Sequence, residues 1–309
     1  CLFVSQGRDC SISWAMHPGT LAVFVLACAA SGRRVSIALA PLSGIDYLQS
    51  SDDTVSNHAA AIFKDLKVQA EVLLNSPLTS GFAERIIFDS STLSEVVAAV
   101  LVEKLRGVLP EGSIEALALQ EEITSLLATP GLLRCVVSDL YKILDADPAA
   151  DGMLEPLLFF KGFHGLSLHR IAHALWLRNE PADRHAALRL QSHVSELFGI
   201  DIHPGAEIGP GVMIDHATGV VIGSTAVLGS DIYMLHQVTL GATGKPMHGA
   251  KRHPTISDGV VLGAGSSVLG DITIGKGATV GANAVVTRPV EEGCTVVSVN
   301  KIIPKKDTR

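Results

Sequence analysis

The segment VLGAGSSVLGDITIGKGATVGANAVV, residues 261–286, decides the fold. An aliphatic residue recurs at every sixth position, and in most units a glycine follows it. A six-residue repeat of this kind is the signature of a parallel β-helix. Three units make one triangular coil, with one aliphatic side chain per unit pointing inward and a small residue allowing the tight corner. The repeated positions are Leu262, Val268, Ile274, Val280 and Val286.

Two interruptions in this spacing mark the places where the β-helix departs from a plain stack. The step between repeated positions lengthens to eight just after Asp215 and His216, and to 22 between Leu240 and Leu262. The longer insertion contains TGKPMHGAKRHP, residues 243–254, which is rich in basic residues and histidines. Because an insertion loses stacking contacts, we expect it to have a use. The earlier repeated positions are Ile202, Ile208 and Ile214, then Ile222, Leu228, Met234 and Leu240.

The chain before the repeats has helical periodicity. Apolar residues recur at helical spacing in about six segments, one with a possible cap at Ser56 and one spanning 156–179. Thr92 and Glu95 have the spacing of a capping box. We therefore predict an α + β chain, with an α-helical N-terminal domain followed by a left-handed parallel β-helix. The predicted divisions are 1–45, a targeting or disordered segment; 46–199, helical; 200–290, β-helix; and 291–309, a C-terminal tail.

The segment 1–45 leaves two interpretations open. Asp9 is its only acidic residue, whereas Arg8, Arg33 and Arg34 are basic, which suits a removed targeting segment of plastid or secretory type. A disordered N-terminus is the alternative. The apolar run 20–30 is about half the roughly 20 residues that a membrane-spanning helix needs. The expected location is the cytoplasm, or the plastid if the segment is a transit peptide, and no membrane association is predicted.

Composition narrows the possible functions. The net charge is −7 over 309 residues, which argues against a nucleic-acid partner. The five cysteines show no C-x-x-C or zinc-ligand spacing, so we predict a reducing environment and no metal site. The flat faces and open ends of a β-helix need covering. We therefore expect a homotrimer or a dimer of trimers.

Three segments together resemble serine O-acetyltransferase, a hexapeptide-repeat acyltransferase family of the cysteine pathway. They are FFKGFHGLSLHRIAHALW at 159–176, DIHPGAEIGPGVMIDHATGVVIG at 201–223 and VTLGATGKPMHGAKRHP at 238–254. The resemblance runs from about residue 147 to residue 289. It implies transfer of acetyl from acetyl-CoA to L-serine, giving O-acetylserine and CoA, as the first step of cysteine biosynthesis from serine. Acetyl-CoA would be a co-substrate, with no tightly bound cofactor.

This reaction needs a base that removes the serine hydroxyl proton as the oxygen attacks the thioester. Imidazole suits the task because its ordinary pKa is near 6.5, and His216 is the candidate. Neighbours on a strand point to opposite sides, so we expect Asp215 to be a poor orienting partner. Asp201 precedes His216 by nearly one coil's length of sequence, and we expect it one coil below. The resemblance likewise implies that Asp201 and His216 form the catalytic dyad.

The resemblance also implies the substrate contacts. Asp147 and Asp215 would hold the substrate ammonium, Arg252 would pair with its carboxylate, and His253 would contact the substrate and assist at the reaction centre. No cysteine has a nucleophile's setting, so we expect direct transfer without an acyl-enzyme. Acetyl-CoA would lie in a groove between adjacent β-helices. The expected contacts there are Gly241, Ala242, Gly263, Ala264 and Lys276.

The chain departs from the family pattern in several places. Ser224 replaces the glutamate of the usual GETAV, and Ala242 replaces the second glycine of GGTGK. The last coil reads VVSVNKIIPKKDTR, residues 296–309, where the family has AGVPA. It also lacks the terminal isoleucine that docks into O-acetylserine sulfhydrylase. That partnership is therefore possible but does not follow from the resemblance.

Three other functions stay open. The fold also supports the γ-class carbonic anhydrases, in which His216, His236 and His253 would hold a zinc-like metal. A related acyltransferase could use homoserine or a sugar as acceptor. The altered last coil would also fit a non-catalytic scaffold. Two further histidines, His169 and His173, have a spacing that can bind metal, but we expect them to pack the helical domain.

Overall fold

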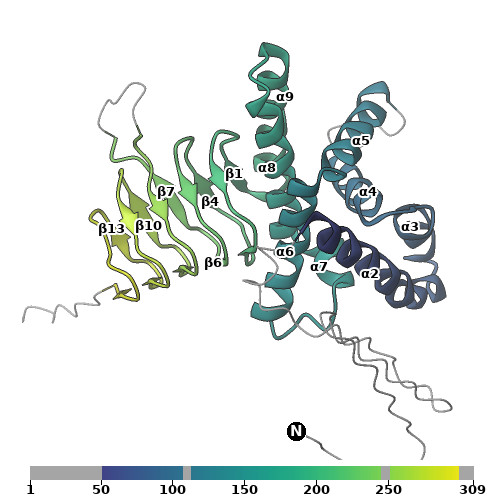
Figure 1. Ribbon diagram of the computed structural model, residues 1–309, viewed down its shortest axis with the longest axis horizontal. Coiled ribbons are helices and arrows are strands. Elements are labelled where there is room, and N and C mark those ends of the chain that lie inside the picture. Colours follow the sequence, from purple (N-terminus) through teal and green to yellow (C-terminus); the bar gives the residue numbers. More distant parts are fainter. Residues whose placement is uncertain (1–50, 107–112, 245–250, 299–309) are drawn as a thin grey trace, which may run out of the picture.

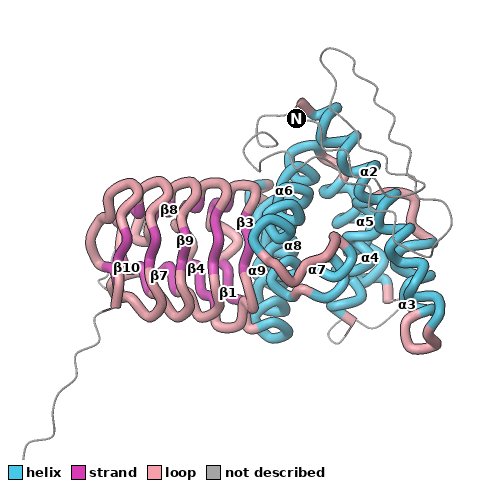
Figure 2. Tube along the Cα trace, turned by 90° about the horizontal axis from the view of Figure 1, so that it is seen from below, coloured by secondary structure: helices cyan, strands magenta, loops and turns pink. Residues whose placement is uncertain are grey.

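The computed structural model describes residues 51–106, 113–244 and 251–298, and it divides into a helical part and a β-helix. Figure 1 shows the two parts end to end, with α6, α8 and α9 beside the first coil. Figure 2 shows the β-helix as a stack of regular turns. The predicted segment 1–45 and most of the predicted tail lie outside the described residues.

The helical part confirms the predicted class but differs in detail. The first helix begins at Asp52, where the Ser51 hydroxyl accepts from the Thr54 amide, and Ser56 lies inside the helix. The single helix predicted over 156–179 is broken by the extended backbone of Phe160. The elements are α2 Asp52–Ala70, η1 Glu71–Asn75, α3 Ser80–Ala83, η2 Glu84–Phe88, α4 Leu93–Leu105, α5 Ile114–Leu127, α6 Pro130–Ala146, α7 Leu154–Phe159, α8 Lys161–Leu177 and α9 Pro181–Phe198.

The β-helix confirms the six-residue repeat. Three parallel sheets run in the orders β1-β4-β7-β10-β13, β11-β8-β5-β2 and β14-β12-β9-β6-β3, which makes about five coils. The strands are β1 Ile200–Ile202, β2 Glu207–Ile208, β3 Val212–Ile214, β4 Val220–Ile222, β5 Val227–Leu228, β6 Ile232–Met234, β7 Thr239–Gly241, β8 Thr255–Ile256, β9 Val261–Leu262, β10 Ser267–Leu269, β11 Thr273–Ile274, β12 Thr279–Val280, β13 Val285–Val286 and β14 Thr295–Val296.

The strand register shows where the coils lengthen. Ile202 pairs with Ile222, Ile222 with Leu240, Leu240 with Val268 and Val268 with Val286. The coils that begin at Ile222 and Val268 keep the regular length of three repeat units, whereas those that begin at Ile202 and Leu240 are longer. The first of the longer coils contains the short insertion, and the second contains the long one. Both interruptions fall where the spacing predicts them. Because β14 pairs with β12, the β-helix extends past the predicted boundary at residue 290.

Two glycines let α8 contact the first coil with its backbone. A Cβ on Gly162 would lie 1.9 Å from the carbonyl oxygen of Ile214, and one on Gly165 would lie 2.5 Å from Cδ1 of Ile200. Real Cβ atoms do not approach other atoms so closely. The helix therefore packs directly against β3, at the residue just before Asp215.

A buried ion pair also joins the two parts. Arg170 of α8 donates to both carboxylate oxygens of Asp139 of α6, at 2.8 and 2.9 Å. The guanidinium further donates to the carbonyls of Ile208 and Gly209, and the Val212 amide donates to Asp139. Asp139 is 0% exposed and Arg170 is 4% exposed. This network fixes both helices to the corner between β2 and β3, and such matched partners are what a buried charge pair requires.

Among the described residues no single helix is both long enough and apolar enough to cross a membrane. The helices α5 and α6 pass that test together, by length and composition, but they meet at 88°.

Candidate active site

The turn between β3 and β4 carries the Asp215-His216 pair. His216 and the next residue, Ala217, both have a φ of 56°, a left-handed conformation that is uncommon outside glycine. The Asp215 amide still donates to the carbonyl of Met234 in the next coil, at 2.7 Å. The Asp215 side chain is 21% exposed and the His216 side chain is 75% exposed. The inserted turn thus displaces His216 from the stack of coils and exposes its side chain to solvent.

The Asp215 carboxylate lies beside the His216 ring. Its Oδ2 is 3.7 Å from Nε2 of His216. The expectation that the two side chains point to different sides is wrong, because the alternation of a strand ends at Ile214 and the positive φ of His216 turns its side chain back. The Asp215 carboxylate is therefore close enough to interact electrostatically with the His216 ring.

Neighbouring residues support this turn. The ring of His236, which follows β6 in the next coil, packs edge-on against His216, with 5.8 Å between ring centroids. The Lys161 ammonium at the start of α8 donates to the Thr218 hydroxyl. Nδ1 of His236 is buried and has no hydrogen-bond partner in the described part of the chain.

Asp147 and Tyr233 lie on the same side as Asp215. Asp147 ends α6, where its carboxylate accepts from the Ala149 amide at 2.9 Å. The Tyr233 hydroxyl on β6 donates to Oδ2 of Asp215 at 3.1 Å. Burial raises the pKa of Tyr233 to about 12, and the negative charges of Asp215 and Asp147 add to the shift. The structure therefore brings together two predicted site carboxylates, His216 and a tyrosine that sequence analysis missed.

Asp201 has a different environment. It lies on β1, where its Oδ1 accepts a hydrogen bond from the side-chain amide (Nε2) of Gln191 on α9, at 2.6 Å. The residue directly above it in the next coil is Val221, 20 positions on, so His216, only 15 positions on, does not stack directly on Asp201 as expected. No hydrogen bond or ion pair joins Asp201 to His216 among the described residues. Their catalytic pairing stays a prediction.

His253 is held firmly at another corner, after the long insertion. It is 6% exposed, and its Nδ1 accepts from the Thr225 amide at 3.1 Å. The ring covers Gly223, where a Cβ would lie 2.0 Å from Nε2 of His253. Burial lowers the pKa of His253, and the charge of Arg252 lowers it further. The imidazole is therefore neutral near neutral pH.

Arg252 presents a guanidinium that no carboxylate of the described residues neutralises. Its Nη2 donates to the hydroxyl of Ser224 at 3.1 Å, and its amide donates to the hydroxyl of Thr225 at 3.0 Å. No described Asp or Glu forms an ion pair with it. Ser224 is the residue that replaces the family's glutamate, so here the partner is neutral. The guanidinium remains available for an anionic group of a ligand.

The acidic group and the basic group lie at different corners of one chain. Asp215 and His216 follow β3, before the chain enters the sheet β1-β4-β7-β10-β13. Arg252 and His253 follow β7, after the chain has left that sheet. The two groups therefore lie at opposite ends of the strands of that sheet. A single chain does not bring them to one centre.

The predicted acetyl-CoA contacts are likewise divided among corners. Gly241 ends β7 and Ala242 follows it. Gly263 and Ala264 lie between β9 and β10, and exposed Lys276 lies between β11 and β12. The Gly263 amide already donates to the carbonyl of Val280 at 2.7 Å, so it is not free for a ligand. One chain does not bring these residues together.

The remaining candidates have structural surroundings. His169 is 4% exposed, and burial lowers its pKa well below 6.5. His173 donates through Nδ1 to the carbonyl of Pro204 at 2.7 Å. Within the described ranges no group of three or more His, Cys, Asp or Glu side chains is arranged to hold a metal ion.

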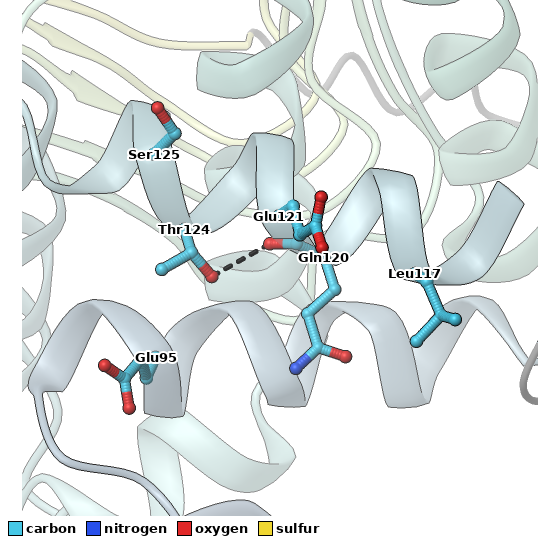
Figure 3. A pocket seen from close by; sticks show the side chains of 6 residues that line it. All are labelled: Glu95, Leu117, Gln120, Glu121, Thr124 and Ser125. Atoms are coloured by element: carbon cyan, nitrogen blue, oxygen red, sulfur yellow. Dashed lines mark hydrogen bonds between the residues drawn. The ribbon is translucent and has the colours of Figure 1, made fainter. Parts of the chain in front are cut away.

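A groove in the helical domain is separate from all of these residues. It has a volume of about 520 Å³ and lies between α4 and α5. Figure 3 shows its side chains, with the Thr124 hydroxyl donating to the Gln120 carbonyl at 2.8 Å. It contains no predicted site residue. The lining residues are Glu95, Leu117, Gln120, Glu121, Thr124 and Ser125.

Comparison with known proteins places these features in a family. Residues 62–167 match the model for the N-terminal domain of serine acetyltransferase, and residues 253–288 match the bacterial transferase hexapeptide model of six repeats. The serine acetyltransferase of Escherichia coli K12 is 38% identical over 250 residues, which is 80% of this chain and 88% of that protein. The probable serine acetyltransferase 4 of Oryza sativa subsp. japonica is 46% identical over 202 residues, 65% of this chain and 61% of that protein.

Solved structures agree with the sequence matches. The Neisseria gonorrhoeae serine acetyltransferase in complex with serine superposes with a TM-score of 0.70 and 40% identity, covering 77% of this chain and 95% of that one. The Brucella abortus serine acetyltransferase in complex with coenzyme A gives 0.72 and 35%, covering 79% and 95%. On sequence and structure together, the chain belongs to the serine acetyltransferase family.

Proposed function

We propose that this chain transfers the acetyl group of acetyl-CoA to the hydroxyl of L-serine, giving O-acetylserine and CoA. This is the first step from serine to cysteine. The observation that carries the proposal is the exposed His216 imidazole with the Asp215 carboxylate 3.7 Å away, in a turn that interrupts the repeat. The relatives solved with serine and with coenzyme A support the choice of substrates.

His216 acts as the general base. It takes the proton of the serine hydroxyl as that oxygen attacks the thioester carbonyl, and the resulting imidazolium is stabilised by a carboxylate. When the tetrahedral intermediate collapses, the C–S bond breaks and the CoA sulfur takes the proton back. Asp201 is the proposed orienting carboxylate of the dyad, and Asp215 lies near enough to contribute.

The acceptor is held at both of its charged ends. Its ammonium binds between Asp147 and Asp215, whose negative charges both raise the pKa of Tyr233. Its carboxylate pairs with the Arg252 guanidinium, which no described carboxylate neutralises. Neutral His253 offers Nε2 toward the reaction centre, because its Nδ1 is bonded to Thr225.

The complete site forms between chains. In a homotrimer, or a dimer of trimers, the acidic corner of one β-helix, with Asp215 and His216, faces the basic corner of its neighbour, with Arg252 and His253. Acetyl-CoA lies in the groove between the two β-helices. The predicted acetyl-CoA contacts lie at separate corners of one chain, so in the groove they are supplied by two neighbouring chains.

Mixed oligomers test this arrangement. His216→Ala and Arg252→Ala chains, each inactive alone, are expected to regain part of the activity when unfolded and refolded together. No recovery from well-assembled mixtures would contradict a shared site.

An acceptor screen tests the reaction itself. Release of the CoA thiol is followed with acetyl-CoA and L-serine, L-homoserine or an amino sugar as acceptor. The expected result is turnover with L-serine and little with the others. Preference for another acceptor would indicate a related acyltransferase, and no turnover by a well-assembled protein would indicate a scaffold.

A further inference from the structure

Tyr233 occupies an outward position on β6, directly beside the acidic corner. Its strand neighbours Ile232 and Met234 are both buried inside the β-helix, so the alternation of the strand places the phenol on the outer face. Its partner in the first coil is Met213, which lies just before Ile214 and Asp215. Tyr233 and Asp215 are therefore diagonal neighbours on the same face.

The tyrosine contacts one oxygen of the carboxylate and leaves the other free. The hydroxyl donates to Oδ2 of Asp215 at 3.1 Å, the same oxygen that lies 3.7 Å from His216. Oδ1 of Asp215 has no hydrogen-bond partner among the described residues. The raised pKa of Tyr233, about 12, keeps the phenol protonated, so near neutral pH it can only remain a donor here.

Helix α6 brings the second carboxylate to the same face. Lys142 forms an ion pair of 2.6 Å with Asp231, which lies just before β6 and Tyr233. Asp147 follows at the end of that helix, and its charge acts on the tyrosine. Two carboxylates that share one region together attract a positively charged ligand. A neutral donor can hold Asp215 in place without competing for the positive charge of that ligand.

We propose that Tyr233 is a positioning residue for the acceptor amine: its hydroxyl holds the Asp215 carboxylate in one orientation, so that Oδ1 and Asp147 receive the ammonium. The assignment rests on the proposed function. A carboxylate already held in one rotamer loses less freedom when the ammonium binds. Tyr233 thus acts on the affinity for L-serine through Asp215, and it neither receives nor gives a proton in the reaction.

Tyr233→Phe tests this role, because it removes the hydroxyl and keeps the ring. Loss of a hydrogen bond to a charged group predicts a rise of roughly tenfold in the KM for L-serine, with kcat within about twofold. The KM for acetyl-CoA is expected to stay unchanged. The matched control is Tyr141→Phe, since Tyr141 is also hydrogen-bonded, to His58 at 3.1 Å, but lies in the helical domain. The control should leave both KM values unchanged.

A double variant separates positioning from a general structural role. If Tyr233 acts only through the Asp215 carboxylate, Tyr233→Phe should have no further effect on the KM for L-serine in an Asp215→Asn background. An additive effect on that KM in the double variant would overturn the assignment.

The outcomes also distinguish the two proposals. An active wild type whose Tyr233→Phe variant keeps the wild-type serine KM would overturn only the role of Tyr233. A wild type that releases no CoA with L-serine would overturn the proposed function, and the role of Tyr233 with it. Thermal melting of each variant checks that the assembly survives the substitution.

Discussion

Gly162 couples the packing of the helical domain to the geometry of the active site. It is the second residue of α8, and a Cβ there would lie 1.9 Å from the carbonyl oxygen of Ile214 and 3.0 Å from its carbonyl carbon. Both atoms belong to the backbone of β3, so neither can rotate away. In Gly162→Ala the helix and the strand must separate by more than about 1 Å to restore ordinary contact. The segment that moves leads directly into Asp215 and His216.

The chain offers a matched control in Gly131→Ala. Gly131 is the second residue of α6, and a Cβ there would meet nothing within 4 Å. The gain from replacing glycine in a helix, up to about 1 kcal/mol, is similar at both sites. Overpacking costs about 1–3 kcal/mol, and a rigid backbone contact belongs at the upper end. Gly162→Ala should therefore be less stable than Gly131→Ala by roughly 2–3 kcal/mol.

Urea unfolding of both variants measures this difference, and CoA release measures its effect on the site. Gly162→Ala should unfold at a lower urea concentration and show a reduced kcat/KM for L-serine, while Gly131→Ala should match or exceed the wild type. Equal unfolding midpoints for the two variants would refute the close contact between α8 and β3.

Three further predictions follow from buried or predicted catalytic groups. Asp139→Ala leaves the Arg170 charge buried and unpaired, so it should cost about 3–5 kcal/mol of stability, and an Asp139→Leu, Arg170→Met double variant should cost less. His164 donates to the carbonyl of Leu157, and burial lowers its pKa to about 4, so its contribution to stability is complete above pH 6.5 and is lost as the pH falls towards 4. That loss is about 3 kcal/mol, and unfolding midpoints of His164→Gln should fall less steeply over this range. Asp201→Asn should lower kcat more than it raises the KM for L-serine, and the reverse would make Asp201 a binding residue.

The spacing of the repeats predicted the β-helix and its irregular coils. Each repeated aliphatic residue is an inward side chain, so the distance between repeats translates directly into strand register. The lengthened step after His216 became the longer coil from Ile202 to Ile222, and the lengthened step after Leu240 became the longer coil from Leu240 to Val268. These predictions succeed because they depend only on which side of a strand faces the core.

The contacts within the site depend on features that the spacing does not contain. The proximity of Asp215 and His216 results from a φ of 56° in the inserted turn, and the environment of Tyr233 results from how α6 docks on the outer face. Asp201 does not stack directly below His216, because their 15-residue separation falls short of the 20 residues that join Asp201 to its register partner Val221. His216 and Arg252 are separated because the strands pass through the three sheets in turn. His216 precedes β4 and Arg252 follows β7, so the two residues lie at opposite ends of strands in one sheet.

The rate of CoA release with L-serine by the His216→Ala variant tests the central claim most directly. We expect kcat to fall by about 10²–10⁴, the contribution of a general base, while sedimentation shows the wild-type assembly. Near-wild-type kcat in a properly assembled variant would contradict the assignment of His216 as the base.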